Sequence, residues 1–153
     1  MSLFRYPSSK HSRRLSPPRY KRYRSYKGYL QHEFERTCVY CRQPDASARN
    51  LNFGIDHYRP KSLFPKLAVD YSNLYYCCGN CNSYKNDYWP RAGEVALLNP
   101  CQWRMSEHIR FEAATGRMTA LTPEGHWLEK LLELNDTAAV KFRRTTLATV
   151  NTL

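Results

Sequence analysis

Acidic residues are missing from the first 32 positions of this chain, although nine Lys or Arg lie there. The remaining residues hold 15 basic and 13 acidic side chains, so most of the net charge of +11 comes from the N-terminal segment. A concentrated basic segment is the usual electrostatic footprint of a polyanion, and we expect nucleic acid as the partner before a membrane. The alternative is a solubilising or disordered tail.

Long apolar runs are also absent. No stretch approaches the roughly 18 apolar residues of a membrane span. The opening residues lead into a basic, polar stretch and lack the apolar region of a signal peptide. We therefore expect a cytoplasmic protein with no membrane partner. In a reducing compartment, paired cysteines indicate metal ligands more readily than disulfides.

Two C-x2-C pairs, Cys38/Cys41 and Cys78/Cys81, predict a metal site. Four thiolates complete the tetrahedral shell of a structural zinc ion, while disulfides and an iron–sulfur cluster are the alternatives. A plain zinc ribbon has roughly 12 to 20 residues between its pairs. Here 36 residues separate Cys41 from Cys78. We expect this insertion to hold an active site.

The insertion has the pattern of two strands joined by a loop. Alternating apolar residues predict a strand over 51–57, and a second short strand is expected over 73–76. Pro60 prevents simple continuation of the first strand and begins a loop that runs to residue 71. A short helix over 81–88 follows the second cysteine pair. The predicted order is strand, loop, strand, helix.

The flanking segments differ from this core. Residues 1–18 are rich in Ser and Pro and are predicted to be a flexible basic arm. Tyrosines at three- and four-residue steps predict a helix over 19–36. In the C-terminal third, a Gly116 turn predicts a hairpin, and Thr122 before a proline predicts the start of a helix.

The predicted elements add up to a small α+β protein. We expect residues 19–153 to form a single domain whose core lies at about 36–90. The hairpin and helices of about 95–153 are expected to support that core. No internal repeats occur.

Four polar residues have the chemistry of phosphodiester hydrolysis. His57 can deprotonate water near neutral pH. Asp56 points to the other face of an extended strand and is free to bind a metal. The amide oxygen of Asn82 is a second expected ligand for Mg²⁺ or Mn²⁺, although an Asn at this place can also cap the helix. Asn73 is placed to hydrogen-bond the loop and fix the imidazole.

Basic side chains near this chemistry are candidate contacts for a nucleic-acid backbone. Lys85 lies three residues after Asn82, on the same helical face, and is a candidate contact. The alternative is that this face of the helix is simply exposed to solvent. The candidates are Arg22, Arg24, Lys27, Arg59, Lys61 and Lys85.

The motif residues follow one another in a recognisable order: Cys38-x2-Cys41, Asp56-His57, Pro60, Asn73-Leu74, and Cys78-x2-Cys81-Asn82-x2-Lys85. This succession resembles the HNH, or ββα-metal, nucleases. More narrowly, it is similar to HNH proteins of bacterial anti-phage and mobile-element loci. The resemblance covers roughly residues 36–90. It departs from many members at Asn82, where they have His.

The resemblance implies roles for individual residues. His57 would be the general base, Asn73 the residue that orients it, and Asp56 and Asn82 the ligands of one catalytic divalent metal. The four cysteines would bind structural zinc. The implied function is an endonuclease that hydrolyses DNA, with RNA as an alternative substrate.

A monomer with one such site would nick. The resemblance implies a role in anti-phage defence, and a chain of this size could be a subunit of a larger defence complex with a partner protein. The alternative is a non-catalytic, zinc-stabilised adaptor that binds nucleic acid.

Overall fold

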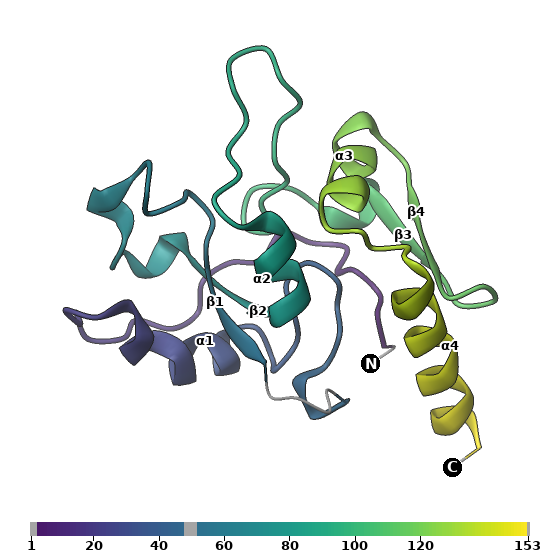
Figure 1. Cartoon of the computed structure of the whole chain (residues 1–153). Helices are drawn as coiled ribbons and strands as arrows, with labels where there is room; N and C mark the ends of the chain where they lie inside the picture. The colour runs from purple at the N-terminus through teal and green to yellow at the C-terminus, as the bar shows by residue number, and fades with distance from the viewer. Residues whose placement is uncertain (1–2, 48–51, 153) are drawn as a thin grey trace.

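The computed structural model describes residues 3–47 and 52–152. Antiparallel strands β1 (Phe53–His57) and β2 (Leu74–Cys78) are followed directly by α2 (Gly79–Lys85), as Figure 1 shows. The register places His57 opposite Leu74. This ββα core confirms the α+β class. Leu51, at the start of the predicted first strand, lies outside the described residues.

The helix predicted over 19–36 is shorter than expected. A 3-10 helix, Tyr23–Tyr26, leads into α1 (Lys27–Glu33). The helix ends there because Glu35 and Arg36 both have left-handed backbone conformations, with φ of 54° and 56°. The residue before the 3-10 helix is extended. Only the second half of the predicted segment is therefore helical.

The N-terminal segment 3–18, which we predicted to be a flexible arm, contains no helix or strand but makes long-range contacts. Phe4 is buried, and its ring packs against Phe111 and Phe142 with centroids 5.5 and 6.2 Å apart. Composition alone indicated a mobile tail because Ser and Pro are frequent. A few long-range aromatic contacts hold the segment in place instead.

Arg13 fixes the middle of this segment. Its guanidinium carbon lies 4.6 to 5.1 Å from the ring centroids of Phe34, Tyr71 and Tyr75. One guanidinium nitrogen donates to the carbonyl of Leu74 at 2.7 Å. The cation is thus stabilised by aromatic faces and by the start of β2.

Glu33 holds the N-terminal segment 3–18 at a second place. Its buried carboxylate accepts hydrogen bonds from the backbone N–H groups of Arg14 and Leu15 and lies 3.0 Å from His11 Nε2. Burial alone would raise the pKa of Glu33, but these hydrogen bonds outweigh it and lower the pKa. A charged carboxylate therefore ties the N-terminal segment to α1.

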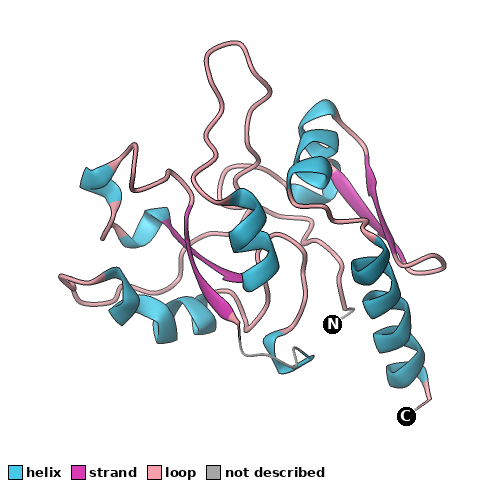
Figure 2. Ribbon diagram, viewed as in Figure 1, coloured by secondary structure: helices cyan, strands magenta, loops and turns pink. Residues whose placement is uncertain are grey.

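The C-terminal third forms the predicted hairpin and helices (Figure 2). Its elements are β3 (Ile109–Glu112), β4 (Arg117–Ala120), α3 (Pro123–Leu131) and α4 (Thr137–Asn151). The Thr122 side chain accepts from Gly125 N and caps α3, as its position before a proline predicted. No helix in the described ranges is long and apolar enough to cross a membrane.

Gly116 joins the hairpin to α4. Its φ of 76° is left-handed, and a Cβ at this position would lie 2.9 Å from the carbonyl oxygen of Val140. Arg143 is buried and donates from Nε to the Gly116 carbonyl at 2.7 Å. The turn thus requires glycine for both backbone conformation and space.

Candidate active site and metal centre

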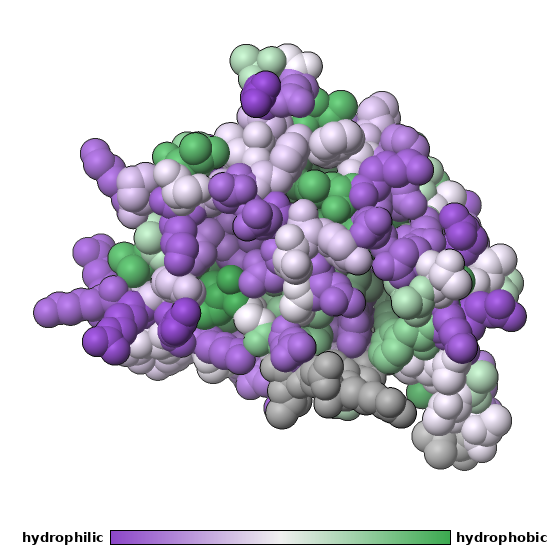
Figure 3. All heavy atoms as spheres, in the orientation of Figure 1, coloured by the Kyte–Doolittle hydropathy of each residue, from purple (hydrophilic) through white to green (hydrophobic). Residues whose placement is uncertain are grey.

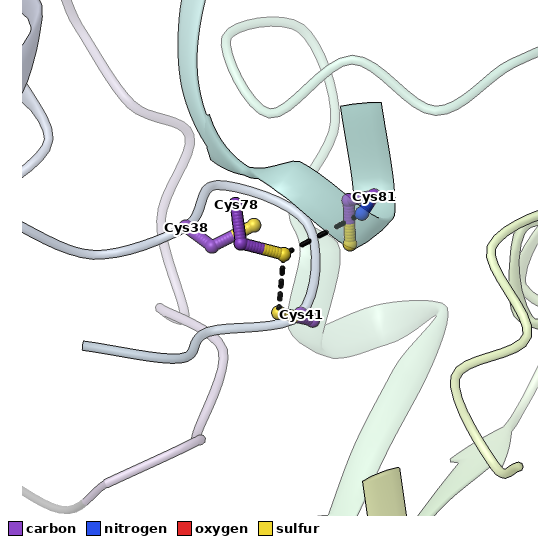
Figure 4. Close-up of side chains that lie close together, drawn as sticks. All are labelled: Cys38, Cys41, Cys78 and Cys81. Atoms are coloured by element: carbon purple, nitrogen blue, oxygen red, sulfur yellow. Dashed lines mark hydrogen bonds between the residues drawn. The ribbon is translucent and has the colours of Figure 1, made fainter. Parts of the chain in front are cut away.

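The four paired cysteines converge on one point. Their sulfur atoms all lie within 4.8 Å of one another, and Cys41 Sγ is 3.7 Å from Cys78 Sγ. Sulfurs around a tetrahedral zinc ion would be roughly 3.8 Å apart, given a Zn–S distance of about 2.3 Å. Figure 4 shows Cys38 and Cys41 on one turn, facing Cys78 and Cys81. The geometry fits a four-thiolate metal site.

Local backbone structure positions these sulfurs. Arg42, just after the first pair, has a φ of 65° and closes the turn with a hydrogen bond to the Cys38 carbonyl. Val39 N donates to the Tyr76 carbonyl at 3.0 Å and attaches the turn to β2. Cys78 caps α2, since its sulfur accepts from Cys81 N. The site therefore joins the turn, β2 and α2.

The protonation of the thiols also fits a cation. Hydrogen bonds to the neighbouring cysteines raise the pKa of Cys41 and of Cys81 well above the ordinary thiol value. Burial would raise the pKa of Cys38, but hydrogen bonds to the other cysteines lower it well below that value. The cluster therefore favours negative charge at Cys38, which a bound cation would balance. Among the residues that the structure describes, this is the one group of three or more His, Cys, Asp or Glu with metal-binding geometry.

His57 ends β1, and its imidazole has a fixed orientation. Nε2 lies 2.9 Å from the Ala68 carbonyl, which can only accept, so Nε2 carries the proton and Nδ1 has the lone pair. Burial, with Lys61 and Lys85 nearby, lowers the pKa of His57 against the opposing effects of Ala68 and Asp56. The imidazole is therefore neutral at neutral pH and can accept a proton.

Asn73 lies where the antiparallel register predicts, beside the end of β1. Its Oδ1 accepts from Arg59 N at 2.8 Å, and its Nδ2 donates to the carbonyls of Arg59 and Leu67 at 3.0 and 3.2 Å. Leu67 directly precedes Ala68, which holds the imidazole. The amide thus fixes both ends of the loop that orients His57.

Asp56 faces away from His57, into the protein. It is 1% exposed. Its Oδ1 lies 3.0 Å from Lys85 Nζ, and its Oδ2 accepts from the Tyr40 hydroxyl at 2.5 Å. Both oxygens therefore have partners inside the protein, and neither faces open solvent.

Comparison with known proteins agrees with this geometry. Residues 38–88 match the HNH endonuclease family. The chain contains an HNH domain. It is 31% identical over 118 residues to the Septu protein PtuB of Bacillus mycoides (strain KBAB4), and 30% identical over 74 residues to the Septu protein PtuB of Bacillus thuringiensis.

These alignments cover 58% and 48% of this chain, but 39% and 27% of the two relatives. The chain therefore spans well under half the length of the curated relatives that it matches. What the comparison supports is a shared domain.

The position of Lys85, in the HNH domain, differs from our prediction. We expected it to contact a nucleic-acid backbone, but it is fully buried. Its ammonium donates to Asp56 Oδ1 and to the carbonyls of His57 and Tyr58, at 3.0 to 3.1 Å. The predicted face of the helix packs on β1, so the cation lies inside the protein. Lys85 is a structural partner of Asp56.

Asn82 is half-buried near β1, with its Nδ2 3.4 Å from the Ile55 carbonyl. An amide oxygen at this place suits a hard cation. Asp56 does not suit one, because a divalent ion at its carboxylate would lie beside the Lys85 ammonium. The two predicted ligands therefore do not form a ready site for a catalytic cation.

The other candidate cations lie at the surface. Arg22, Arg24 and Lys27 are exposed on or beside the N-terminal helices. Figure 3 shows hydrophilic side chains projecting at the lower left, near the segment that leads into α1. Lys61 is exposed in the loop after β1. All four are accessible to a polyanion.

Arg59, in the same loop, is exposed as well. Its guanidinium carbon lies 4.8 Å from the ring centroid of Trp89 and 5.3 Å from that of Phe64. Stacking on two rings restricts the guanidinium while leaving its N–H groups available for hydrogen bonds.

Three contributors to the site were not predicted. Tyr40 binds Asp56, the Ala68 carbonyl orients His57, and Tyr23 packs its ring against His57. The spacing of the tyrosines indicated only that Tyr23 lies on a helix face. Backbone carbonyls have no sequence signal, and Tyr40 gave none beyond its place between two cysteines.

Proposed function

We propose that this chain is an endonuclease that hydrolyses DNA phosphodiester bonds with His57 as the general base. The observation that carries the proposal is the fixed imidazole: Nε2 donates to Ala68, and Asn73 fixes the loop around it. The HNH domain at residues 38–88 supports the same reaction. The proposed role for Asn73 is to position the base.

In this mechanism Nδ1 of His57 takes a proton from water, and the hydroxide attacks the phosphorus atom. The bond from phosphorus to the 3′ oxygen breaks, and that oxygen is protonated by solvent. The products are 3′-hydroxyl and 5′-phosphate ends, as the family resemblance implies, and the attacking oxygen remains on the 5′ phosphate. Exposed cations such as Arg59 hold the flanking backbone.

We propose zinc as the ion of the four-cysteine site, where it stabilises the turn, β2 and α2. The catalytic Mg²⁺ or Mn²⁺ that the family implies would be held by Asn82, with water and phosphate oxygens as its other ligands. Such an ion would stabilise charge on the leaving oxygen. We assign Asp56 to structure, since its carboxylate already pairs with Lys85.

The proposal extends to the biology that the resemblance implies. A single His57 centre per chain acts on one strand at a time, which makes nicking the expected product. The two matched relatives carry the name Septu protein PtuB. We propose a role in anti-phage defence, together with a partner protein.

A supercoiled plasmid tests the activity. With Mg²⁺ added, the wild type is expected to convert the plasmid to the nicked form, and His57→Ala is expected to lose this activity. His126→Ala is the matched control, because His126 is exposed on α3. DNA binding without cutting, in either divalent metal, would support the non-catalytic adaptor instead.

A further inference from the structure

Tyr23 brings an element from outside the HNH match to the proposed base. Its ring centroid lies 4.5 Å from that of His57, and the two planes meet at 77°. Tyr23 belongs to the 3-10 helix that precedes α1, whereas the family match begins at residue 38. The half-buried phenol covers one side of the imidazole. The surroundings of His57 therefore depend on the N-terminal basic segment.

Two cations from separate segments converge on this phenol. Lys61 Nζ lies 3.5 Å from the Tyr23 hydroxyl and 4.7 Å from its ring centroid. The Arg24 guanidinium carbon lies 5.8 Å from the same centroid. Hydrogen bonds to Arg24 and Lys61 lower the pKa of Tyr23, although burial opposes them. The hydroxyl thus lies in a positive local field.

Neither cation is balanced by an ion pair in the part of the chain that the structure describes. The ion pairs found there include neither Arg24 nor Lys61. Holding two like charges around one ring costs Coulomb energy, and a bound anion would remove that cost. A phosphodiester offers one negative charge and oxygen acceptors for N–H and O–H donors.

We propose that the Tyr23 hydroxyl, Lys61 and Arg24 form a phosphate-binding subsite beside His57. This assignment rests on the proposed nuclease function. The subsite binds a phosphate of the DNA backbone next to the scissile phosphate. Tyr23 is then a substrate contact, and its ring also positions the base. The N-terminal segment contributes directly to substrate alignment.

The subsite can be tested by DNA binding without cleavage. A short fluorescent DNA duplex is titrated with protein at several salt concentrations and with no added Mg²⁺ or Mn²⁺. Each phosphate contact by a cation contributes about −0.9 to the slope of log K against log salt. Lys61→Gln is expected to make the slope shallower by about this amount and to weaken binding at low salt roughly tenfold.

Tyr23→Phe separates the hydroxyl from the ring. It keeps the packing on His57 and removes a neutral donor, so binding is expected to weaken by roughly threefold to tenfold with an unchanged salt slope. Lys66→Gln is the matched control, because Lys66 is an exposed lysine in the same loop that lies outside the subsite. Its slope and affinity are expected to equal those of the wild type. Thermal unfolding of each variant checks its folding.

Wild-type slope and affinity in both Lys61→Gln and Tyr23→Phe would overturn the subsite, as would a wild type that does not bind the duplex. If both variants bind DNA like the wild type, plasmid cutting that depends on His57 can still be observed. Failure of the subsite is therefore distinguishable from failure of the nuclease. The expected binding shifts in a protein that never cuts plasmid would remove the nuclease proposal and keep the subsite.

Discussion

Asp56 and His57 are neighbours in the chain but face opposite sides of β1. That separation was predictable, because side chains alternate along an extended strand. The surroundings of each face were not predictable from the sequence. Asp56 meets Tyr40 and Lys85 in the interior, whereas His57 meets a loop and a phenol. A helical-face argument placed Lys85 on the same face of the helix as Asn82 but gave no information on its depth.

Asp56→Asn tests the structural assignment. It would leave the Lys85 ammonium buried without its partner, and we expect a loss of about 3–5 kcal/mol in the free energy of unfolding, measured in urea. Asp56→Asn combined with Lys85→Met removes the orphaned charge and should recover most of this loss. Glu107→Gln, which breaks the exposed pair with Arg104, is the control and should change stability by less than about 1 kcal/mol.

An Asp56→Asn variant as stable as the wild type would contradict the buried pair. So would a double variant that is no more stable than Asp56→Asn alone.

At the scale of elements, local signals predicted most of the ββα core and the hairpin. The cysteine turns, Pro60, Gly116 and the Thr122 cap all act within a few residues, so their sequence patterns are informative. The helix over 19–36 was overextended mainly at its start, because the tyrosine spacing begins at Tyr20 whereas the backbone at Arg22 is still extended. At its end, Glu35 and Arg36 turn left-handed. Packing at long range, such as that of Phe4, has no local pattern.

The four-cysteine site joins the turn at 38–41 to the end of β2 and the start of α2, so metal loss should be costly. We expect one zinc ion per chain and a large fall in the thermal midpoint of Cys78→Ser, because structural zinc supplies folding free energy. Metal analysis and thermal unfolding check both points. Cys101→Ser is the control, since Cys101 lies outside the cluster and should not be needed for zinc.

A Cys78→Ser protein that is soluble, native-like and active would count against the zinc assignment. Loss of zinc in Cys101→Ser would count against the assigned ligands.

At the scale of the whole molecule, the basic N-terminal segment connects the two halves. It packs Phe4 against the C-terminal third and ties His11 and Arg14 to Glu33 of α1. Its charge was predictable from composition, but its fixed position was not. The segment leads into Tyr23 and Arg24, which have defined places near His57 that a mobile tail would not provide.

Acid should weaken this attachment. The pKa of Glu33 in the folded protein is lowered from 4.5, so the unfolded chain binds the proton first as the pH falls. The stability due to Glu33 is therefore present above about pH 4.5 and lost below it. Burial lowers the pKa of His11 from 6.5, so its effect has the same sign and begins below about pH 6.5. We expect the thermal midpoint to fall from pH 7 to pH 4.

Glu33→Gln should flatten the acid part of this dependence, while Glu94→Gln, at an exposed site, should leave it unchanged. A wild-type midpoint that is constant over this range would contradict the attachment through Glu33.

Chemical rescue of the base tests the central claim most directly. His57→Ala should nick plasmid about 10²- to 10⁴-fold more slowly than the wild type, because a general base contributes about that much. Added imidazole can enter the space left beside Tyr23 and should raise the rate of His57→Ala without raising that of the wild type. A His57→Ala rate equal to wild type, or one that does not respond to imidazole, would contradict a base at His57.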